Sequence, residues 1–296
     1  MIAQNISSST IFSLKLRAYV ELLKPRLSML VAFSCAFGYG LASRESVNWQ
    51  VLLMVTLGAF LLSGASVCIN QLIEKDLDKI MTRTMNRPLP TGRITVNEAI
   101  VFSIICMTFS LAILWIYTNP LTVVLSIVSM ILYSFIYTPL KRVGPVAVFV
   151  GAIPGALPPL LGWTAYTASI TYEATIIFGI QFIWQFPQFW AIAWVADDDY
   201  KKAGFKLLPS GGGKDLNTAI QIMIYTMFLI PLGLLPAMFG ITGLNSAIIS
   251  SICGVAFFAQ TFSLMKTGSQ QSAKRIMFGS FLYLPIVQIA YLFDKL

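Results

Sequence analysis

Long runs without a charged residue alternate with short charged segments along this chain. A helix needs about 20 mostly apolar residues to cross the hydrocarbon core of a bilayer. The charge-free runs cover residues 27–43, 46–73, 99–140, 143–172, 174–196, 216–265 and 276–293. Two of them, 99–140 and 216–265, are long enough for two crossings each, with turns expected at Asn119-Pro120 and at residues 240–243. The pattern predicts an all-α membrane protein with nine transmembrane helices.

The composition supports this class. Hydrophobic residues make up 57% of the chain and charged residues 11%, whereas soluble domains carry about 25% charged residues. These values exclude an ordinary soluble protein.

Basic residues fall almost entirely on one side of the membrane when nine spans are assumed. That side receives Lys15, Arg17, Lys24, Arg26, Lys75, Lys79, Arg83, Arg87, Arg93, Lys141, Arg142, Lys201, Lys202, Lys206, Lys214, Lys266, Lys274 and Arg275. Only Arg44 and Lys295 remain on the other side. Because Lys and Arg accumulate in short cytoplasmic loops, we expect a cytoplasmic N-terminus and an external C-terminus. The net charge of +8 is explained by this topology and by anionic headgroups or substrates, and a nucleic-acid partner has no support.

Two acidic segments follow predicted spans on this basic side. Asn70, Glu74 and Asp78 are spaced four residues apart, so on a continuing helix they share one face. Two acids at this spacing repel each other unless a cation lies between them. Oxygen ligands of this kind suit Mg²⁺. The second segment, residues 197–199, consists of three consecutive aspartates after the sixth span.

The two acidic segments lie four predicted helices apart. This separation predicts two four-helix halves that offer their acidic loops to a shared cavity, followed by a ninth helix. We therefore expect a cytoplasmic segment over residues 1–26 and a single transmembrane domain over residues 27–296.

Facing carboxylates, flanking bases and an apolar interior suggest prenyl transfer. Carboxylates bind Mg²⁺, Mg²⁺ binds diphosphate oxygens, and Arg and Lys neutralise the remaining phosphate charge. An apolar cavity can hold an isoprenoid chain, and aromatic faces can stabilise the allylic cation that develops as diphosphate leaves. Aromatic residues before the second acidic segment are Trp184, Phe186, Phe189, Trp190 and Trp194.

The block NQLIEKDLDKIMTRTMNRPLPTGR at residues 70–93 resembles the signature of the protoheme IX farnesyltransferases, the heme O synthase branch of the UbiA prenyltransferase superfamily. Supporting segments are LLKPRL at 22–27, YTPLKR at 137–142, GAIPGALPPLLGW at 151–163, DDDYKKAG at 197–204 and FLYLPI at 281–286. The resemblance implies a UbiA-like bundle around a central cavity. It also implies transfer of the farnesyl group of farnesyl diphosphate to a vinyl group of protoheme IX (heme B). A hydroxyl is added at the same substituent, which gives heme O and diphosphate for heme–copper oxidases.

The resemblance also implies roles for particular residues. Asn70, Glu74 and Asp78 would hold one Mg²⁺, and Asp199, helped by Asp198, another. Candidate diphosphate contacts are Arg83, Arg87, Lys141, Arg142, Lys202, Tyr137 and Tyr200. Asp76 lies about 200° around a helix from its acidic neighbours, so we expect it to face solvent or a loop cation.

One departure from the family pattern concerns the heme. Members commonly carry a histidine after the proline of the sixth span, but this chain has Gln188 there and no histidine anywhere. Histidine is therefore excluded as an axial heme ligand or general base. Gln188 can still hydrogen-bond a propionate, a water molecule or solvent on the iron.

Two alternatives remain open from the residues. A related enzyme could prenylate an aromatic quinone precursor with the same metal chemistry. A polytopic transporter is the non-enzymatic alternative, although transporters place ionisable residues near the membrane midplane. Under the preferred hypothesis the partners are farnesyl diphosphate, protoheme IX and the lipid bilayer. A downstream heme-modifying enzyme or terminal oxidase would receive the product. The location would be a bacterial-type inner membrane, with the active-site loops on the cytoplasmic side.

Overall fold

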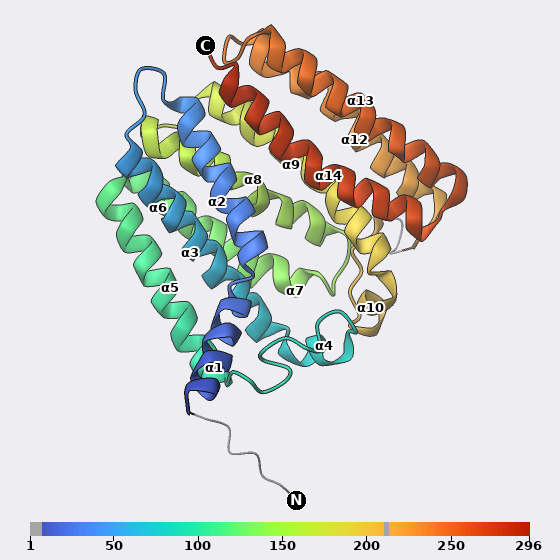
Figure 1. The fold of residues 1–296 in the computed structure, drawn as a ribbon. Coiled ribbons are helices and arrows are strands. Elements are labelled where there is room, and N and C mark those ends of the chain that lie inside the picture. The colour runs from blue at the N-terminus through green and yellow to red at the C-terminus, as the bar shows by residue number, and fades with distance from the viewer. Residues whose placement is uncertain (1–7, 210–212) are drawn as a thin grey trace, which may run out of the picture.

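The computed structural model describes residues 8–209 and 213–296, which form helices without a β-strand (Figure 1). The elements are α1 (Ser8–Leu22), α2 (Pro25–Ala42), α3 (Trp49–Ile73), α4 (Lys75–Ile80), α5 (Val96–Tyr117), α6 (Pro120–Ile131), the π-helix η1 (Leu132–Tyr137), α7 (Thr138–Leu140), α8 (Val146–Thr167), α9 (Tyr172–Val195), α10 (Asp197–Lys202), α12 (Leu216–Met238), α13 (Leu244–Thr267) and α14 (Gln270–Phe293). The all-α prediction is confirmed for these residues. Residues 1–7 of the expected N-terminal segment lie outside the described part of the chain.

Eight helical segments in the described residues are long and apolar enough to cross a membrane. They are α3, α5, the continuous segment from α6 to α7, α8, α9, α12, α13 and α14. The remaining expected span corresponds to α2, which has 18 residues, begins with Pro25 and Arg26, and packs along α3 and α8. The count of nine spans and the orientation of the N-terminus stay predictions.

Both expected turns within the long apolar runs are confirmed. Asn119 caps α6 by accepting a hydrogen bond from the Thr122 N–H at 3.0 Å, and Pro120 occupies the first turn, where its missing N–H costs nothing. The second turn contains Gly240 with φ of 67°, a left-handed conformation that favours glycine. Each uncharged run therefore folds back as two helices.

Glycines allow α2 and α8 to cross at very short distance. A Cβ atom built on Gly38 would lie 1.9 Å from the Pro159 carbonyl oxygen, and one on Gly162 would lie 1.9 Å from the Cys35 carbonyl oxygen. Small residues permit such backbone contact in membrane helices. This crossing joins the first and second parts of the bundle, while the division into two four-helix halves remains a prediction.

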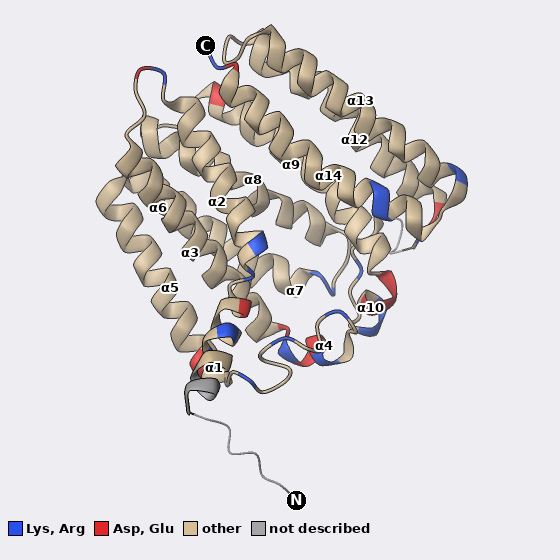
Figure 2. Ribbon diagram, viewed as in Figure 1, with Lys and Arg blue, Asp and Glu red and all other residues tan. Residues whose placement is uncertain are grey.

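Charged residues gather at one end of the bundle, around α1, α4 and α10 (Figure 2). The C-terminus and the loop between α2 and α3 lie at the other end (Figure 1). Helix α1 is attached at the charged end because Lys15 pairs with Glu98 and Arg93 pairs with Glu21 at 2.8 Å. These ion pairs attach α1 to the end of the loop that follows α4 and to the start of α5.

Candidate functional site

A bend in the chain positions the first acidic segment. Helix α3 ends at Ile73, Glu74 has φ of −94° and ψ of 6°, and α4 starts at Lys75, so the single continuing helix expected from the spacing is interrupted. The Glu74 and Asp78 N–H groups still donate to carbonyls four residues earlier, at 3.0 and 2.8 Å. The helical spacing therefore survives the bend, and Asn70, Glu74 and Asp78 are 2%, 4% and 0% exposed.

Each buried acid of this segment is paired with a base. Lys141 Nζ lies 2.8 Å from Glu74 Oε1, and Arg87 Nη1 donates to both carboxylate oxygens of Asp78 at 2.9 and 2.7 Å. Buried charges require such partners because their desolvation is costly. The pairing neutralises the two acids and relieves the repulsion that their spacing would cause. Asp76, in contrast, is exposed and pairs with Lys79, as expected.

The donor set of this segment fits a hard cation. Asn70 uses its amide nitrogen to bond Thr138 at 3.0 Å, which leaves its carbonyl oxygen without a donor among the described residues. That oxygen and the two carboxylates are the ligand types that Mg²⁺ prefers. Within the described ranges no three or more His, Cys, Asp or Glu side chains form a metal-binding group. A metal would therefore need the amide oxygen, substrate oxygens or water to complete its coordination.

Asp199 brings the second acidic segment onto the first. Its two carboxylate oxygens accept hydrogen bonds from the backbone N–H groups of Thr82 and Arg83, both at 3.0 Å. Lys202 Nζ lies 3.4 Å from the same carboxylate. The N–H groups of Arg83 and Thr82 lower the pKa of Asp199 to about 2, so this carboxylate stays ionised near neutral pH. The two acidic loops thus meet, as the sequence hypothesis requires.

The three consecutive aspartates have different environments. Asp197 is buried and pairs with Lys201 at 2.8 Å and Lys214 at 3.4 Å. The Asp198 side chain is 87% exposed and lies outside the cluster, with Lys214 at 3.9 Å as its nearest base. Successive residues of a helix point about 100° apart, so the three cannot share one face. Asp199 is therefore the member of this segment that contacts the first loop.

Basic and aromatic side chains alternate around the acids. Lys141 Nζ lies 4.8 Å from the centre of the Tyr137 ring, and the Arg83 guanidinium lies 5.9 Å from that of Tyr200. Burial raises the pKa of the Tyr200 hydroxyl, so this group remains a hydrogen-bond donor. Arg142 is exposed and has no ion-pair partner in the described residues. The structure therefore places Lys141, Arg83 and Tyr137 in the cluster and Arg142 at its edge.

The aromatic residues of α9 serve different purposes. Phe189 lies 5.9 Å, ring centre to ring centre, from Tyr137 of the charged cluster. Phe186 and Trp190 pack on Tyr225 of α12, with ring centres 4.6 and 5.1 Å apart. Trp184 donates its indole N–H to the Ser280 carbonyl at 3.0 Å, and therefore joins α9 to α14. Phe189 is the α9 ring with a direct contact to the site.

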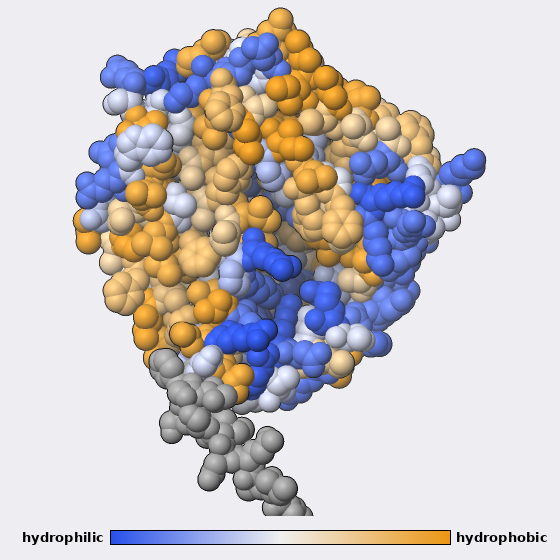
Figure 3. Space-filling model, viewed as in Figure 1, coloured by the Kyte–Doolittle hydropathy of each residue, from blue (hydrophilic) through white to orange (hydrophobic). Residues whose placement is uncertain are grey.

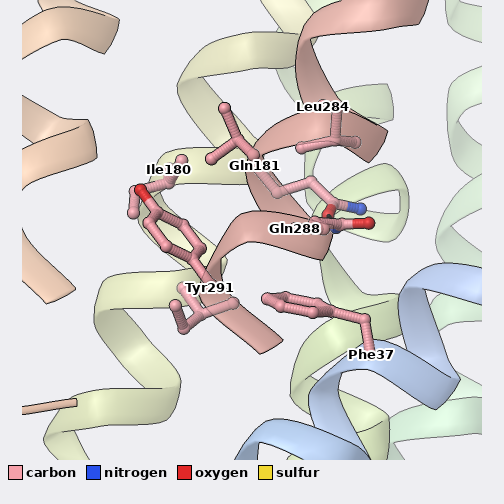
Figure 4. A pocket seen from close by; sticks show the side chains of 8 residues that line it. Phe37, Ile180, Gln181, Leu284, Gln288 and Tyr291 are labelled. Atoms are coloured by element: carbon pink, nitrogen blue, oxygen red, sulfur yellow. Dashed lines mark hydrogen bonds between the residues drawn. The ribbon is translucent and has the colours of Figure 1, made fainter. Parts of the chain in front are cut away.

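Glutamines continue from this site along α9 into the bundle. Gln188 has a buried side-chain oxygen without a hydrogen-bond partner in the described residues, and Gln185 is 6% exposed with no such partner either. Deeper in the bundle, Gln181 accepts from Gln288 at 2.8 Å and lines a cavity of about 10 Å³ (Figure 4). A cavity of that size holds about one water molecule. Unused amide groups are thus available to a ligand between the charged cluster and this inner cavity.

Sequence reasoning missed three residues beside the cluster. Lys24 has φ of 44°, and burial together with the charges of Arg87 and Lys141 lowers its pKa well below the usual value. Its signal was the Lys-Pro-Arg triplet that begins the first span. Tyr133, 5.5 Å from Tyr137 between ring centres, gave no signal, because it lies in an ordinary apolar run. Thr138 lies in the YTPLKR segment that supports the family resemblance, but nothing in that segment marked its hydroxyl as part of the site.

Figure 3 shows a hollow between the start of α2 and the elements α10 and α14. Hydrophilic residues border it on the side of the polar loops, and hydrophobic residues border it on the side of the helices. A molecule with an anionic head and an apolar tail matches these two surfaces.

Comparison with known proteins identifies the family. A model of the UbiA prenyltransferase family matches residues 31–284, which is most of the chain. The chain belongs to the UbiA prenyltransferase family.

Individual relatives of this UbiA chain narrow the comparison. The protoheme IX farnesyltransferase of Cytophaga hutchinsonii is 51% identical over 280 residues, covering 95% of this chain and 98% of the relative. The protein of the same name from Flavobacterium psychrophilum is 44% identical over 285 residues, covering 94% of both chains.

Solved structures share the fold of this UbiA member. A structure described as digeranylgeranylglyceryl phosphate synthase superposes with a TM-score of 0.78 at 21% identity, covering 95% of this chain and 98% of that one. A UbiA homolog from Archaeoglobus fulgidus bound to DMAPP and Mg²⁺ superposes with a TM-score of 0.67 at 19% identity, covering 92% and 98%. The prediction of a UbiA-like helical bundle is thereby confirmed.

Proposed function

We propose that this UbiA member is a heme O synthase. It would transfer the farnesyl group of farnesyl diphosphate to a vinyl group of protoheme IX, with hydroxyl addition. The observation that carries the prenyl-transfer chemistry is the contact of Asp199 with Thr82 and Arg83, which joins both acidic loops beside the buried Glu74 and Asp78. The identity of 51% to a protoheme IX farnesyltransferase supports the heme acceptor.

Asn70, Glu74 and Asp78, together with Asp199, are the residues that would hold Mg²⁺. The bound metal would act as a Lewis acid on the diphosphate leaving group. Lys141 and Arg87, which now neutralise Glu74 and Asp78, can share their donors with phosphate oxygens. The DMAPP and Mg²⁺ bound by the Archaeoglobus homolog support this arrangement.

Further bases would contact the diphosphate from the other loops. Arg83 and Lys202 lie beside Asp199, and Lys24 lies within electrostatic range of Arg87. An incoming anion favours the charged form of Lys24, which burial now disfavours. Tyr137 and Tyr200 supply hydroxyl groups in the same region, while Arg142 would act from the edge of the site.

The reaction balances with water as co-reactant. Diphosphate leaves with both electrons of the C–O bond, and the allylic carbon forms a C–C bond with the vinyl group. Water then adds to the resulting cation and releases one proton. Rings of Tyr133, Tyr137 and Phe189 are placed to stabilise positive charge on the prenyl group.

Gln188 would contact the heme in place of the histidine that this chain lacks. Its buried side-chain oxygen has no partner in the described residues, so a ligand donor or water on the heme side would satisfy it. Gln185, one turn deeper, offers a second unused amide. Heme O formed in a bacterial-type inner membrane would pass to a heme-modifying enzyme or a terminal oxidase.

Product mass tests the proposed function. Purified protein is incubated with farnesyl diphosphate, Mg²⁺ and either protoheme or 4-hydroxybenzoate, the latter representing quinone precursors. The expected product is farnesylated and hydrated heme, and chelation of divalent metal should abolish it. A prenylated benzoate without a heme product would overturn the heme assignment, and the absence of either product with full metal loading would overturn prenyl transfer.

A further inference from the structure

The π-helix η1 places one hydroxyl group in an unusual position. Threonine hydroxyls in α-helices usually bond a carbonyl three or four residues earlier. Thr138, directly after η1, donates instead to the carbonyl of Tyr133, five residues earlier, at 2.9 Å. Thr138 is 2% exposed, so it has essentially no access to water as an alternative acceptor.

The same hydroxyl receives a bond from the candidate metal ligand Asn70. Asn70 Nδ2 lies 3.0 Å from Thr138 Oγ1, and Asn70 is also 2% exposed. A hydroxyl carries one proton, and that of Thr138 is used by the Tyr133 carbonyl, which can only accept. Thr138 can therefore only accept from Asn70, which must present its NH₂ group to it. This fixes which end of the amide carries the oxygen.

We propose that Thr138 is a positioning residue that sets the amide of Asn70 so that its oxygen is available to a divalent cation. The proposal rests on the proposed function, since it assumes a metal at Asn70, Glu74 and Asp78. An amide nitrogen has no lone pair to donate to a metal. If the Asn70 amide were flipped, so that its oxygen and nitrogen exchanged places, the metal would lose one of its ligands. The π-turn contributes by bringing the Thr138 hydroxyl and the Tyr133 carbonyl together.

A purely structural role for Thr138 makes different predictions. In that case removal of the hydroxyl lowers stability but leaves metal affinity unchanged in the folded protein. Thr122 provides a matched control, because it is 0% exposed, lies in the same span and bonds Asn119 and Thr164 far from the acidic loops.

The test measures Mn²⁺ binding by electron paramagnetic resonance without substrate turnover, alongside thermal unfolding. Loss of an outer partner of a metal ligand typically weakens metal binding about 10–100-fold, and we expect this for Thr138→Val. Thr138→Ser, which keeps the hydroxyl, and Thr122→Val should bind as wild type. Should Thr138→Val fail to fold, Thr138→Ala carries the same comparison.

A second substitution distinguishes orientation from packing. Aspartate has two equivalent oxygens and needs no orienting partner. The double variant Asn70→Asp with Thr138→Val should therefore recover the Mn²⁺ affinity that Thr138→Val alone loses. Wild-type affinity in Thr138→Val, with affinity lost in Asn70→Ala, would overturn the role of Thr138 and leave the metal site intact. Wild-type affinity in Asn70→Ala would instead overturn the metal site of the proposed function.

Discussion

Neighbouring residues of identical type have opposite environments at this site. Asp197 is buried in ion pairs, Asp198 faces solvent, and Asp199 bonds the backbone of the facing loop. The difference follows from the 100° rotation between successive helical residues. The run of three aspartates in the sequence therefore indicates which segment belongs to the site. The contact with Thr82 in the structure shows that Asp199 is the aspartate that reaches it.

Asp198 and Asp199 form a matched pair for mutation. Asp199→Asn removes the charge that accepts two backbone N–H bonds, so we expect loss of prenyl transfer and faster proteolysis within residues 82–93. Asp198→Asn should leave both close to wild type, because its side chain is 87% exposed. Equal loss in the two variants would show that the acidic segment acts as a whole.

Arg87 illustrates how one side chain can serve two partners. Its Nη1 alone contacts both oxygens of Asp78, which leaves Nη2 and Nε for a phosphate. Arg87→Lys can keep the ion pair with its single nitrogen but lacks these extra donors. Removing the base altogether would leave Asp78 as an uncompensated buried charge, which costs about 3–5 kcal/mol.

We therefore expect Arg87→Lys to fold and to raise the KM for farnesyl diphosphate about tenfold, the effect of losing a charge-assisted hydrogen bond of about 1.4 kcal/mol. Arg93→Lys is the control, since Arg93 pairs with Glu21 away from the acids. Steady-state kinetics in detergent measure the difference. An unchanged KM would show that Arg87 has only a structural role, as the ion-pair partner of Asp78.

At the scale of elements, the crossing of α2 and α8 depends on two glycines. Gly38→Ala and Gly162→Ala each place a Cβ 1.9 Å from a backbone oxygen of the other helix, and backbone cannot move aside as a flexible side chain can. Overpacking of this kind costs about 1–3 kcal/mol or more. We expect both variants to unfold at lower temperature.

Gly179→Ala, in α9, is the corresponding control. Among the described residues, no packing neighbour lies within 4 Å of the place that a Cβ on Gly179 would occupy. Alanine also favours helix by about 0.5–1 kcal/mol over glycine. Thermal unfolding in detergent should therefore show an unchanged or raised midpoint for this variant. A similar loss for all three substitutions would indicate a general intolerance of alanine in the helices.

Helix boundaries within the long apolar runs were predictable where turn-forming residues interrupt the run. The turns at Asn119-Pro120 and Gly240 follow from cap chemistry and glycine conformation, both of which are local. The bend at Glu74 and the π-turn before Thr138 were not predictable. The residues at both places are ordinary for an α-helix. In the structure each place has a hydrogen-bond partner far along the chain: Glu74 accepts from Lys141, and Thr138 accepts from Asn70.

At the scale of the molecule, charged residues gather at the end of the bundle formed by α1, α4 and α10 (Figure 2). The positive-inside rule assigns that end to the cytoplasm. We expect Glu45→Cys, in the loop between α2 and α3, to react with a membrane-impermeant maleimide in intact cells. Lys201→Cys, at the charged end, should react only after permeabilisation. The reverse pattern would invert the orientation, and labelling of both in intact cells would contradict the span count.

The sequence by itself determined the class of protein, the approximate position of the helices and the signature block that indicates the family. These depend on hydropathy and on residue order, which are properties of short segments. Only the tertiary structure decided which partners the acids contact. The contact of Asp199 with Thr82 joins residues 117 positions apart, and the ion pair of Lys141 with Glu74 joins residues 67 apart. Such contacts depend on how whole helices pack, which no local pattern records.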